Sequence, residues 1–354
     1  MRSERRSGVV LAMVLILGLL LSTAVLTFSH RSMMDGMISR NRDDAARAEA
    51  LARGGINVAI GLILEDALRD ADATGDGAAF AGETLDDVWV RIADTQLETP
   101  DGGILKLRIE DTGSRLNLNA LVDYAKDDSG FADQSDAEEF MTDFLTKIID
   151  EMELPPGERT YDDPRELARN LIDFIDPDDV RVGGRGDEDG YYQDQTPPYR
   201  AANHPLLSVD QIGMIEGFDR NLVKALSHYV TVYPLVAAQG INLNTAPPHV
   251  LTVVYHGTSA GRELMNASDV GRILKLREEG SIICDETEVD PDRCVPLAEV
   301  VPEGSIYPAV RLPSSSSVFT VTAEARVGDS LRTLEAVIDR QSGNRPQVLL
   351  WRYR

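Results

Sequence analysis

The strongest constraint on this chain is an uncharged apolar run that extends from Val9 to Phe28. A helix of that length rises about 30 Å, which is enough to cross the hydrocarbon core of a bilayer. Arg2, Arg5 and Arg6 precede the run, and basic residues flanking a membrane span stay on the cytoplasmic side. We therefore expect a single membrane pass, with the N-terminus in the cytoplasm and the rest of the chain exported.

Two processing routes fit this segment. A cleaved secretory signal has an apolar region of roughly 7–15 residues followed by a small-x-small cleavage site. The run here is longer, and the sequence after it, from Ser29 onward, offers no such site and continues with a helical pattern. A simple signal-anchor that stays in the membrane is the plainest interpretation.

A more specific interpretation rests on Gly8, the last residue of the short basic leader. This layout resembles that of bacterial pilins and pseudopilins, in which a prepilin peptidase cleaves after the glycine. The resemblance implies cleavage between Gly8 and Val9, with Val9 N-methylated as the new N-terminus. Most such proteins have a glutamate at the fifth mature position, whereas this chain has Met13.

Composition limits the classes of function. The 354 residues carry a net charge of −24, and the basic residues are not gathered into a stripe. A surface that tracks nucleic-acid phosphates is therefore disfavoured. The acidic side chains fit either a solvated surface or the binding of hard cations.

The two cysteines, Cys284 and Cys294, bracket the segment CDETEVDPDRC. An even count, close spacing and an exported location predict one disulfide that closes a small loop. No further cysteine or histidine lies at ligand spacing, so zinc is disfavoured.

The order of periodic segments predicts a mixed α+β fold. The apolar positions from Ala45 to Leu64 recur every three or four residues, which extends the N-terminal helix, with a weak point at Gly54 and Gly55. Alternating patterns predict one hairpin over residues 88–109 and another over residues 317–340. Between them, helical patterns predict short helices over residues 135–152, 163–176, 207–218, 219–230, 246–257 and 268–280, several of which have Ser, Asp or Pro at their starts. They form a region of nearly two hundred residues that is inserted into a small sheet. The tail from Gly343 is short, basic and aromatic, and no role follows from its pattern.

Several motifs in order carry a family resemblance. They are the leader ending at Gly8, GSRLNLNAL from Gly113, LIDFIDPDD from Leu171, PPYRAANHPLLSVDQIGMIEGF from Pro197, INLNTAPPHVL from Ile241, and a closing hairpin that begins VFTVTAEA. Together they resemble the general secretion pathway protein K family, the largest minor pseudopilins of type II secretion systems. The resemblance covers essentially the whole chain.

The resemblance implies a pilin-like antiparallel sheet with a large inserted all-α domain of two helix-hairpin-helix (SAM-like) modules. It also implies an inner-membrane anchor, a periplasmic C-terminal domain, and other minor pseudopilins and prepilin peptidase as partners. The expected parts are a leader (1–8), the N-terminal helix (9–70), the first sheet part (84–115), a first module (116–235), a second module with the disulfide loop (236–312), the second sheet part (315–342) and a tail (343–354).

The resemblance further implies a position at the tip of the periplasmic pseudopilus, and Met13 agrees with it. In pilin-like proteins the fifth-position glutamate is thought to pair with the N-terminal amine of the next subunit up. A subunit at the tip has no such neighbour. A buried unpaired carboxylate would cost several kcal/mol, so an apolar residue is the better choice there.

The acidic loop DPDDVRVGGRGDEDGYY is the main ligand candidate. Six carboxylates converge on a glycine-rich segment, and such a loop can supply the six to eight oxygens that calcium prefers. They are Asp176, Asp178, Asp179, Asp187, Glu188 and Asp189. The loop is not an EF-hand, because its sixth position is Arg181 rather than glycine. The family resemblance also implies calcium in the inserted domain.

Two other acidic segments are weaker candidates for a cation. The stretch from Asp72 to Glu83 nearly matches an EF-hand loop, but Thr74 stands at its third position, so a polar turn after a helix is the simpler interpretation. The disulfide loop carries Asp285, Glu286, Glu288, Asp290 and Asp292.

Other classes of function find less support. The chain has no G-x-S-x-G, H-E-x-x-H or Walker sequence, and its histidines (His30, His204, His228, His249 and His256) stand apart from any nucleophile. We therefore predict that it is not an enzyme. INLNTAPPHVL also resembles the start of DNA-binding helix-hairpin-helix modules, but its surroundings are acidic. A membrane-anchored scaffold or binding protein outside any pilus is the main alternative.

Overall fold

The structure is a computed structural model. It describes residues 4–75, 82–124, 134–153, 161, 163–183, 188–236, 240–258, 261–284, 294–301, 315–340 and 346–353.

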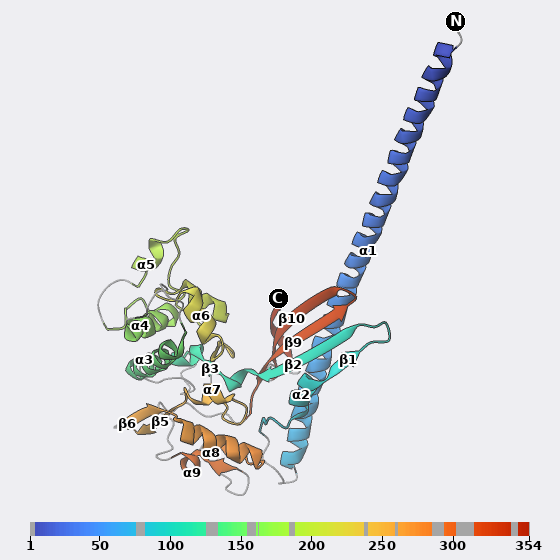
Figure 1. The fold of residues 1–354 in the computed structure, drawn as a ribbon. Helices are drawn as coiled ribbons and strands as arrows, with labels where there is room; N and C mark the ends of the chain where they lie inside the picture. Colours follow the sequence, from blue (N-terminus) through green and yellow to red (C-terminus); the bar gives the residue numbers. More distant parts are fainter. Residues whose placement is uncertain are drawn as a thin grey trace.

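The long N-terminal helix α1 (Glu4–Gly75) spans 72 residues, and its N-terminal half projects away from the rest of the molecule (Figure 1). Within the described residues it is the one helix long and apolar enough to cross a membrane, and its apolar window is wholly exposed. The C-terminal half of α1 lies against a sheet. There Gly55 permits close packing, because a Cβ at this position would lie 2.8 Å from a methyl group of Leu107.

The sheet has five antiparallel strands in the order β1-β2-β9-β10-β11. They are β1 (Gln96–Glu98), β2 (Ile104–Asp111), β9 (Val318–Val327), β10 (Ser330–Asp339) and β11 (Gln347–Tyr353). Helix α1 packs across β2, β9 and β10, and alternate residues of these strands join α1 in one apolar core. Both expected hairpins are therefore present, and the unassigned tail forms a fifth strand.

The prediction for the start of the first hairpin is wrong. The alternation over residues 88–92 predicts a strand, whereas the chain forms α2 (Val88–Arg91) and the 3₁₀ turn η1 (Ile92–Asp94). The buried Trp89 packs edge-on against Phe319 with ring centroids 5.3 Å apart. Anchoring this one large side chain under the sheet outweighs the weak preference of alternating residues for a strand.

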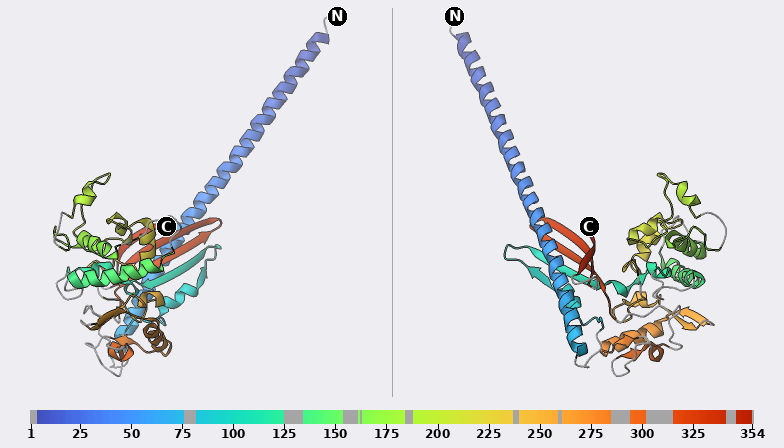
Figure 2. Two further views of the ribbon diagram at one scale, coloured as in Figure 1. Left: turned by 60° about the vertical axis from the view of Figure 1, so that its left-hand side comes forward. Right: turned by 180° about the vertical axis from the view of Figure 1, so that it is seen from behind.

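The helical region is inserted between β2 and β9, which are neighbours in the sheet although the insertion separates them in sequence. It lies to one side of the sheet (Figures 1 and 2). Its first part contains η2 (Thr112–Ser114), β3 (Leu116–Asn117), η3 (Leu118–Leu121), α3 (Gln134–Glu151), α4 (Pro164–Ile175), α5 (Gly190–Gln193), η4 (Val209–Met214), α6 (Arg220–Leu226) and β4 (Val230–Thr231). Helices α3, α4 and α6 match expected helices, and the expected helix at 207–218 is the 3₁₀ turn η4.

The second part contains α7 (Pro248–Leu251), β5 (Tyr255–Thr258), β6 (Gly261–Leu264), α8 (Ala267–Glu278), β7 (Ile283–Cys284), β8 (Val295–Pro296) and α9 (Leu297–Val300). The prediction of a helix over residues 246–257 is wrong in its second half. Helix α7 has only 4 residues, and the chain then enters the β5–β6 hairpin. Arg262 of this hairpin binds Asp136 and Glu139 of α3. That cross-link between distant segments is not visible in local periodicity.

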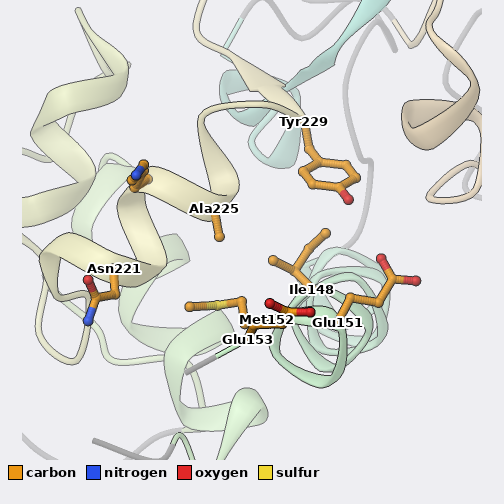
Figure 3. A pocket seen from close by; sticks show the side chains of 8 residues that line it. Ile148, Glu151, Met152, Glu153, Asn221, Ala225 and Tyr229 are labelled. Carbon is orange, nitrogen blue, oxygen red and sulfur yellow. The ribbon is translucent and has the colours of Figure 1, made fainter. Parts of the chain in front are cut away.

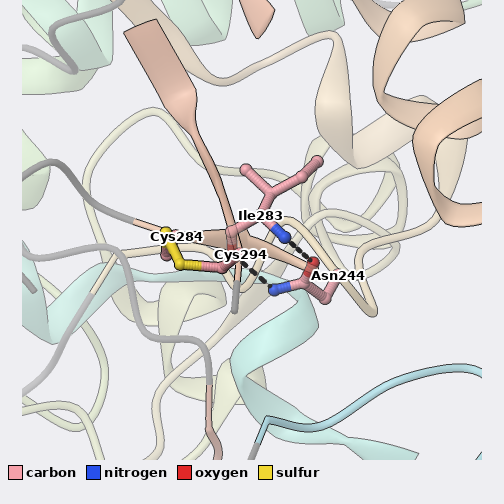
Figure 4. Close-up of a disulfide and its surroundings, with 4 residues drawn as sticks. All are labelled: Asn244, Ile283, Cys284 and Cys294. Atoms are coloured by element: carbon pink, nitrogen blue, oxygen red, sulfur yellow. Dashed lines mark hydrogen bonds between the residues drawn. A yellow bond between two sulfur atoms is a disulfide. The ribbon is translucent and has the colours of Figure 1, made fainter. Parts of the chain in front are cut away.

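Two N-x-N motifs begin the two parts of the insertion in the same way. The side-chain amide of Asn119 donates to the carbonyl of Leu206 at 3.0 Å and accepts from its N–H at 2.8 Å. Asn244 forms the same pair with Ile283, at 2.9 and 2.8 Å (Figure 4). Each buried asparagine thus binds the main chain of a distant segment and satisfies its own polar groups. One continuous apolar core joins both parts.

Candidate functional site

Three buried carboxylates lie together where helix α4 ends. Asp173, Asp176 and Glu188 each place a carboxylate oxygen within 4.8 Å of the others. Asp173 lies in the last turn of α4, and Asp176 is its C-cap. Pro177 follows and cannot continue the helix, so the chain turns back here. Glu188 reaches the same point from the segment before α5.

The hydrogen bonds of this cluster leave several oxygens without a donor. Asp173 accepts from the N–H of Val182 at 2.7 Å, and Asp176 accepts from the side-chain amide of Gln134 at 2.7 Å. The second oxygen of Asp176 and both oxygens of Glu188 are buried without a hydrogen-bond partner in the described part of the chain. Buried polar atoms are almost always satisfied in native proteins.

Burial and mutual repulsion disfavour the charged forms of these groups. The pKa of Asp173 is raised to about 6 by burial, against a nearby Arg181 that lowers it. Burial and the charges of Asp178 and Asp173 raise the pKa of Asp176 to about 7. Burial and the same acidic neighbours raise the pKa of Glu188 to about 8. Without a cation, burial and mutual repulsion therefore disfavour full ionisation of all three carboxyl groups near neutral pH.

The cluster contains two of the six carboxylates singled out in the sequence. Asp178, Asp179 and Asp189 serve other roles: they accept from the N–H of Val180 at 2.8 Å, the amide of Asn203 at 3.0 Å and the N–H of Ala201 at 3.1 Å, respectively. Asp187 lies outside the described residues.

Asp173 is not among the carboxylates predicted from the sequence. It lies three residues before Asp176 in the predicted helix, so both side chains share a helix face. That spacing could have identified it.

A second acidic cluster contains an arginine partner. Asp66, Glu83 and Asp87 come together under the sheet, where the buried Arg340 binds Glu83 and lies 3.9 Å from Asp66. The indole N–H of Trp89 also donates to Glu83, at 3.2 Å. Glu83, the last position of the EF-hand-like stretch, therefore belongs to an internal ion pair. The side chain of Asp72 and residues 76–81 lie outside the described part.

The expected disulfide between Cys284 and Cys294 is present (Figure 4). Both cysteines are buried. The bond joins Cys284 of β7 to the residue just before β8, and these two strands pair in parallel. The five acidic residues of the loop that it closes lie outside the described residues.

Gly8, Val9 and Met13 lie in the first turns of α1. Val9 and Met13 are both more than half exposed, so the expected new N-terminal residue lies on the surface of the described part of the chain.

A pocket of about 390 Å³ lies between the end of α3 and α6 (Figure 3). It is lined by Ile148, Glu151, Met152, Glu153, Asn221, Lys224, Ala225 and Tyr229. Glu151 is paired with Lys147 at 2.6 Å. None of the eight lining residues is a histidine, cysteine or serine.

Comparisons with known proteins point to one family. A family model described as "Type II secretion system (T2SS), protein K" matches residues 114–235, the segment that contains the acidic cluster. The type II secretion system protein K of Aeromonas hydrophila is 27% identical over 256 residues, which is 70% of each chain. That of Pseudomonas aeruginosa is 26% identical over 250 residues, covering 71% of this chain and 68% of the relative.

A solved structure shares the fold. It is a chain of the GspK-GspI-GspJ complex from the type 2 secretion system of enterotoxigenic Escherichia coli. The match has a TM-score of 0.55 at 19% identity, and it covers 92% of this chain and 99% of that chain.

Proposed function

Because the chain belongs to the type II secretion system protein K family, we propose that this minor pseudopilin stands at the tip of the periplasmic pseudopilus. There it would promote pseudopilus assembly and protein export across the outer membrane, as a structural component and not as an enzyme. The observation that carries the proposal is the pilin-like arrangement. One long helix has an exposed apolar half and packs its other half on an antiparallel sheet (Figure 1).

Two features support the tip position. Met13 stands where a subunit with an upper neighbour would need a glutamate, and an unpaired buried carboxylate would be costly there. The inserted helical region adds bulk beside the sheet (Figure 2). The relative from enterotoxigenic E. coli is solved in complex with GspI and GspJ, and we propose that other minor pseudopilins are likewise the partners of this chain.

Processing at Gly8 tests the pseudopilin assignment. Prepilin peptidase must fit a residue without a side chain at the cleaved bond, so Gly8→Val should block cleavage while membrane insertion persists. Gly18→Val is the matched control, because Gly18 lies inside the apolar run with open space around it. N-terminal sequencing should find methylated Val9 in the unmutated chain and in the control. An intact Met1 in the unmutated chain would instead favour a membrane-anchored scaffold outside any pilus.

Met13→Glu tests the tip position separately. The new carboxylate gains no partner if the subunit has no upper neighbour, so secretion should be unchanged or impaired relative to Met13→Leu. Improved secretion by Met13→Glu would contradict the tip position without touching the pseudopilin assignment.

We also propose that Asp173, Asp176 and Glu188 hold a calcium ion. Their carboxylates fit a hard cation, since a divalent ion would supply the missing partner of each orphaned oxygen and remove the repulsion between them. Other oxygens, from main-chain carbonyls and water, would complete a shell of six to eight. When bound, the ion supplies charge compensation and ties α4 to the segment before α5.

The calcium proposal predicts a stabilisation that depends on these three residues. A ligand at about 100 times its Kd stabilises the folded state by about 2.7 kcal/mol, so the full chain in detergent should melt higher in calcium than in chelator. The triple variant Asp173→Asn, Asp176→Asn, Glu188→Gln should lose this difference. The control variant Asp178→Asn, Asp179→Asn, Asp189→Asn should keep it, since those carboxylates bind main-chain or amide groups instead. If the unmutated chain has the same melting temperature in calcium and in chelator, the calcium proposal is wrong.

A further inference from the structure

Four side chains that can bind a soft metal ion lie together on α1, directly after its apolar run. They are His30, Met33, Met34 and Met37. Three of the 9 methionines of the chain thus fall within five consecutive positions. We call the four residues the His–Met cluster. Neither the acidic clusters nor the disulfide nor the expected cleavage site involves any of them.

Helical spacing brings the members of the His–Met cluster to one face. Residues three or four positions apart on a helix are neighbours, with Cβ atoms about 5–6 Å apart. His30 has Met33 and Met34 at these spacings, and each of those methionines has Met37. At about 100° per residue, the four positions share an arc of about 100° around the helix axis. Because α1 is continuous through this segment, one imidazole and three thioethers point to the same side.

The rest of the described chain leaves the cluster uncovered. Met33 is 71% exposed, Met34 48% and Met37 62%, and His30 is exposed as well. They lie in the half of α1 that projects away from the sheet (Figure 1). The first buried side chain of α1 within the described residues is Ala48, about three turns further on. All four side chains can therefore turn toward one ion without disturbing the core.

The ligand types in the cluster select a soft cation. Thioethers suit Cu(I), and imidazole suits copper as well, whereas carboxylates and carbonyls suit calcium and magnesium. Both cysteines of the chain are joined in a disulfide, so no thiol competes for such an ion. A thioether also stays available in an oxidising compartment, where cysteines pair. The cluster therefore differs in chemistry from the buried acidic group at the end of α4.

We propose that the His–Met cluster binds one Cu(I) ion at the exported end of the membrane span. The thioethers and a neutral imidazole carry no charge, so the bound ion keeps its single positive charge. The inference goes beyond the proposed function, because it uses only the ligands and the helix that holds them. It requires no partner subunit and no cleavage of the leader.

An apolar packing face is the other explanation for three exposed methionines. Leucine is close to methionine in volume and helix propensity, so it would keep such a face while removing the sulfur. The double variant Met33→Leu, Met37→Leu therefore separates the two explanations. Met13→Leu is the matched control, because Met13 is an isolated methionine on the same helix and is 66% exposed.

Competition with a chromophoric Cu(I) chelator measures the affinity. The full chain in detergent would be titrated with Cu(I) that ascorbate keeps reduced. The double variant should bind Cu(I) at least about tenfold more weakly than the unmutated chain, since loss of even an outer-shell partner costs about 10–100-fold. His30→Gln should also bind more weakly, and Met13→Leu should bind like the unmutated chain. Circular dichroism checks that each variant keeps its helix.

Methyl resonances locate the ion in the unmutated chain. With isotope-labelled methionine methyl groups, Ag(I) nitrate serves as a soft probe that needs no reductant. It should shift the resonances of Met33, Met34 and Met37 and leave those of Met13 and the buried Met141 in place. Zn(II), which prefers thiolate, imidazole and carboxylate ligands, should shift none of the methionine methyl groups.

Three results contradict the inference. They are equal Cu(I) affinity of the double variant and the unmutated chain, no methyl shift with Ag(I), and shifts of Met13 as large as those of the cluster. The first two mean that the methionines are only an apolar face, and the third means that the ion binds without a specific site. If a variant fails to fold, the methyl resonances of the unmutated chain decide. None of these results bears on the proposed function, which the processing experiment tests separately.

Discussion

At the scale of single residues, the acidic cluster shows how position decides the role of a carboxylate. Asp178 and Asp179 are exposed, and they accept from the N–H of Val180 and from the side-chain amide of Asn203, respectively. Asp176 and Glu188 are instead buried with orphaned oxygens. All four stand in one acidic segment of the sequence. The difference arises because the end of α4 turns Asp176 inward toward Asp173.

The raised pKa values give a prediction for the metal-free chain. Folding raises the pKa of Asp176 to about 7 and that of Glu188 to about 8, from ordinary values near 4. Groups of this kind stabilise the fold fully when protonated below about pH 4, and the contribution is lost as pH rises through the folded values. In chelator, the melting temperature should therefore fall between pH 5 and pH 8. Glu188→Gln, which stays neutral, should flatten the fall, and a flat profile in the unmutated chain would contradict the assigned environment.

At the scale of elements, two short devices tie the second part of the insertion together. Asn244 joins the start of that part to Ile283, and the adjacent Cys284 is bonded to Cys294. The parallel pair of β7 and β8 has only two residues in each strand. Strands that short have little stability of their own, so the disulfide and the hydrogen bonds of Asn244 stabilise the β7–β8 pair.

Removing the disulfide should measure that contribution. A loop closed across ten residues corresponds to about 2–3 kcal/mol of chain entropy in the unfolded state. Cys294→Ser with Cys284→Ser should lower the free energy of unfolding by about that amount, as followed by circular dichroism in urea. Reducing agent should lower the stability of the unmutated chain similarly and leave the double variant unchanged. A double variant as stable as the oxidised chain would show that the loop is already ordered without the bond.

At the scale of the whole molecule, one buried aspartate joins the sheet to the insertion. Asp111 ends β2, and its carboxylate accepts from the N–H of Gly113 at 2.7 Å, from the amide of Asn242 at 3.1 Å and from the hydroxyl of Thr245. The N–H of Asn242 in turn donates to the carbonyl of Gly113 at 2.8 Å. The start of the second part of the insertion is thus fastened to the end of a sheet strand.

Asp111→Asn should loosen this junction while keeping its shape. The amide would replace one of the two accepting oxygens with an NH2 group, so a donor would face either the N–H of Gly113 or the amide of Asn242. A buried mismatch of this kind costs about 1–3 kcal/mol. We expect faster limited proteolysis of the insertion and earlier loss of its helical signal on heating. Asp101→Asn, in the exposed turn before β2, is the control and should behave like the unmutated chain. Unchanged proteolysis of Asp111→Asn would mean that other contacts hold the junction.

The sequence alone determined the parts of this protein that depend on local chemistry. The uncharged run predicted the long apolar N-terminal helix, alternation predicted the closing hairpin, and the spacing of two cysteines predicted their bond. Helices α3, α4 and α8 follow from periodicity, because each buries one face and carries its own start signal.

Tertiary structure decided what depends on partners distant in sequence. Trp89 turned an alternating segment into a helix, because its anchoring under the sheet outweighs a weak local preference. Asp173 joined the acidic cluster, and Asp178, Asp179 and Asp189 left it, because only packing determines which carboxylates lose contact with water. The C-terminal tail became a sheet strand for the same reason. Its residues are apolar and aromatic in any conformation, but only pairing with β10 places them beside α1.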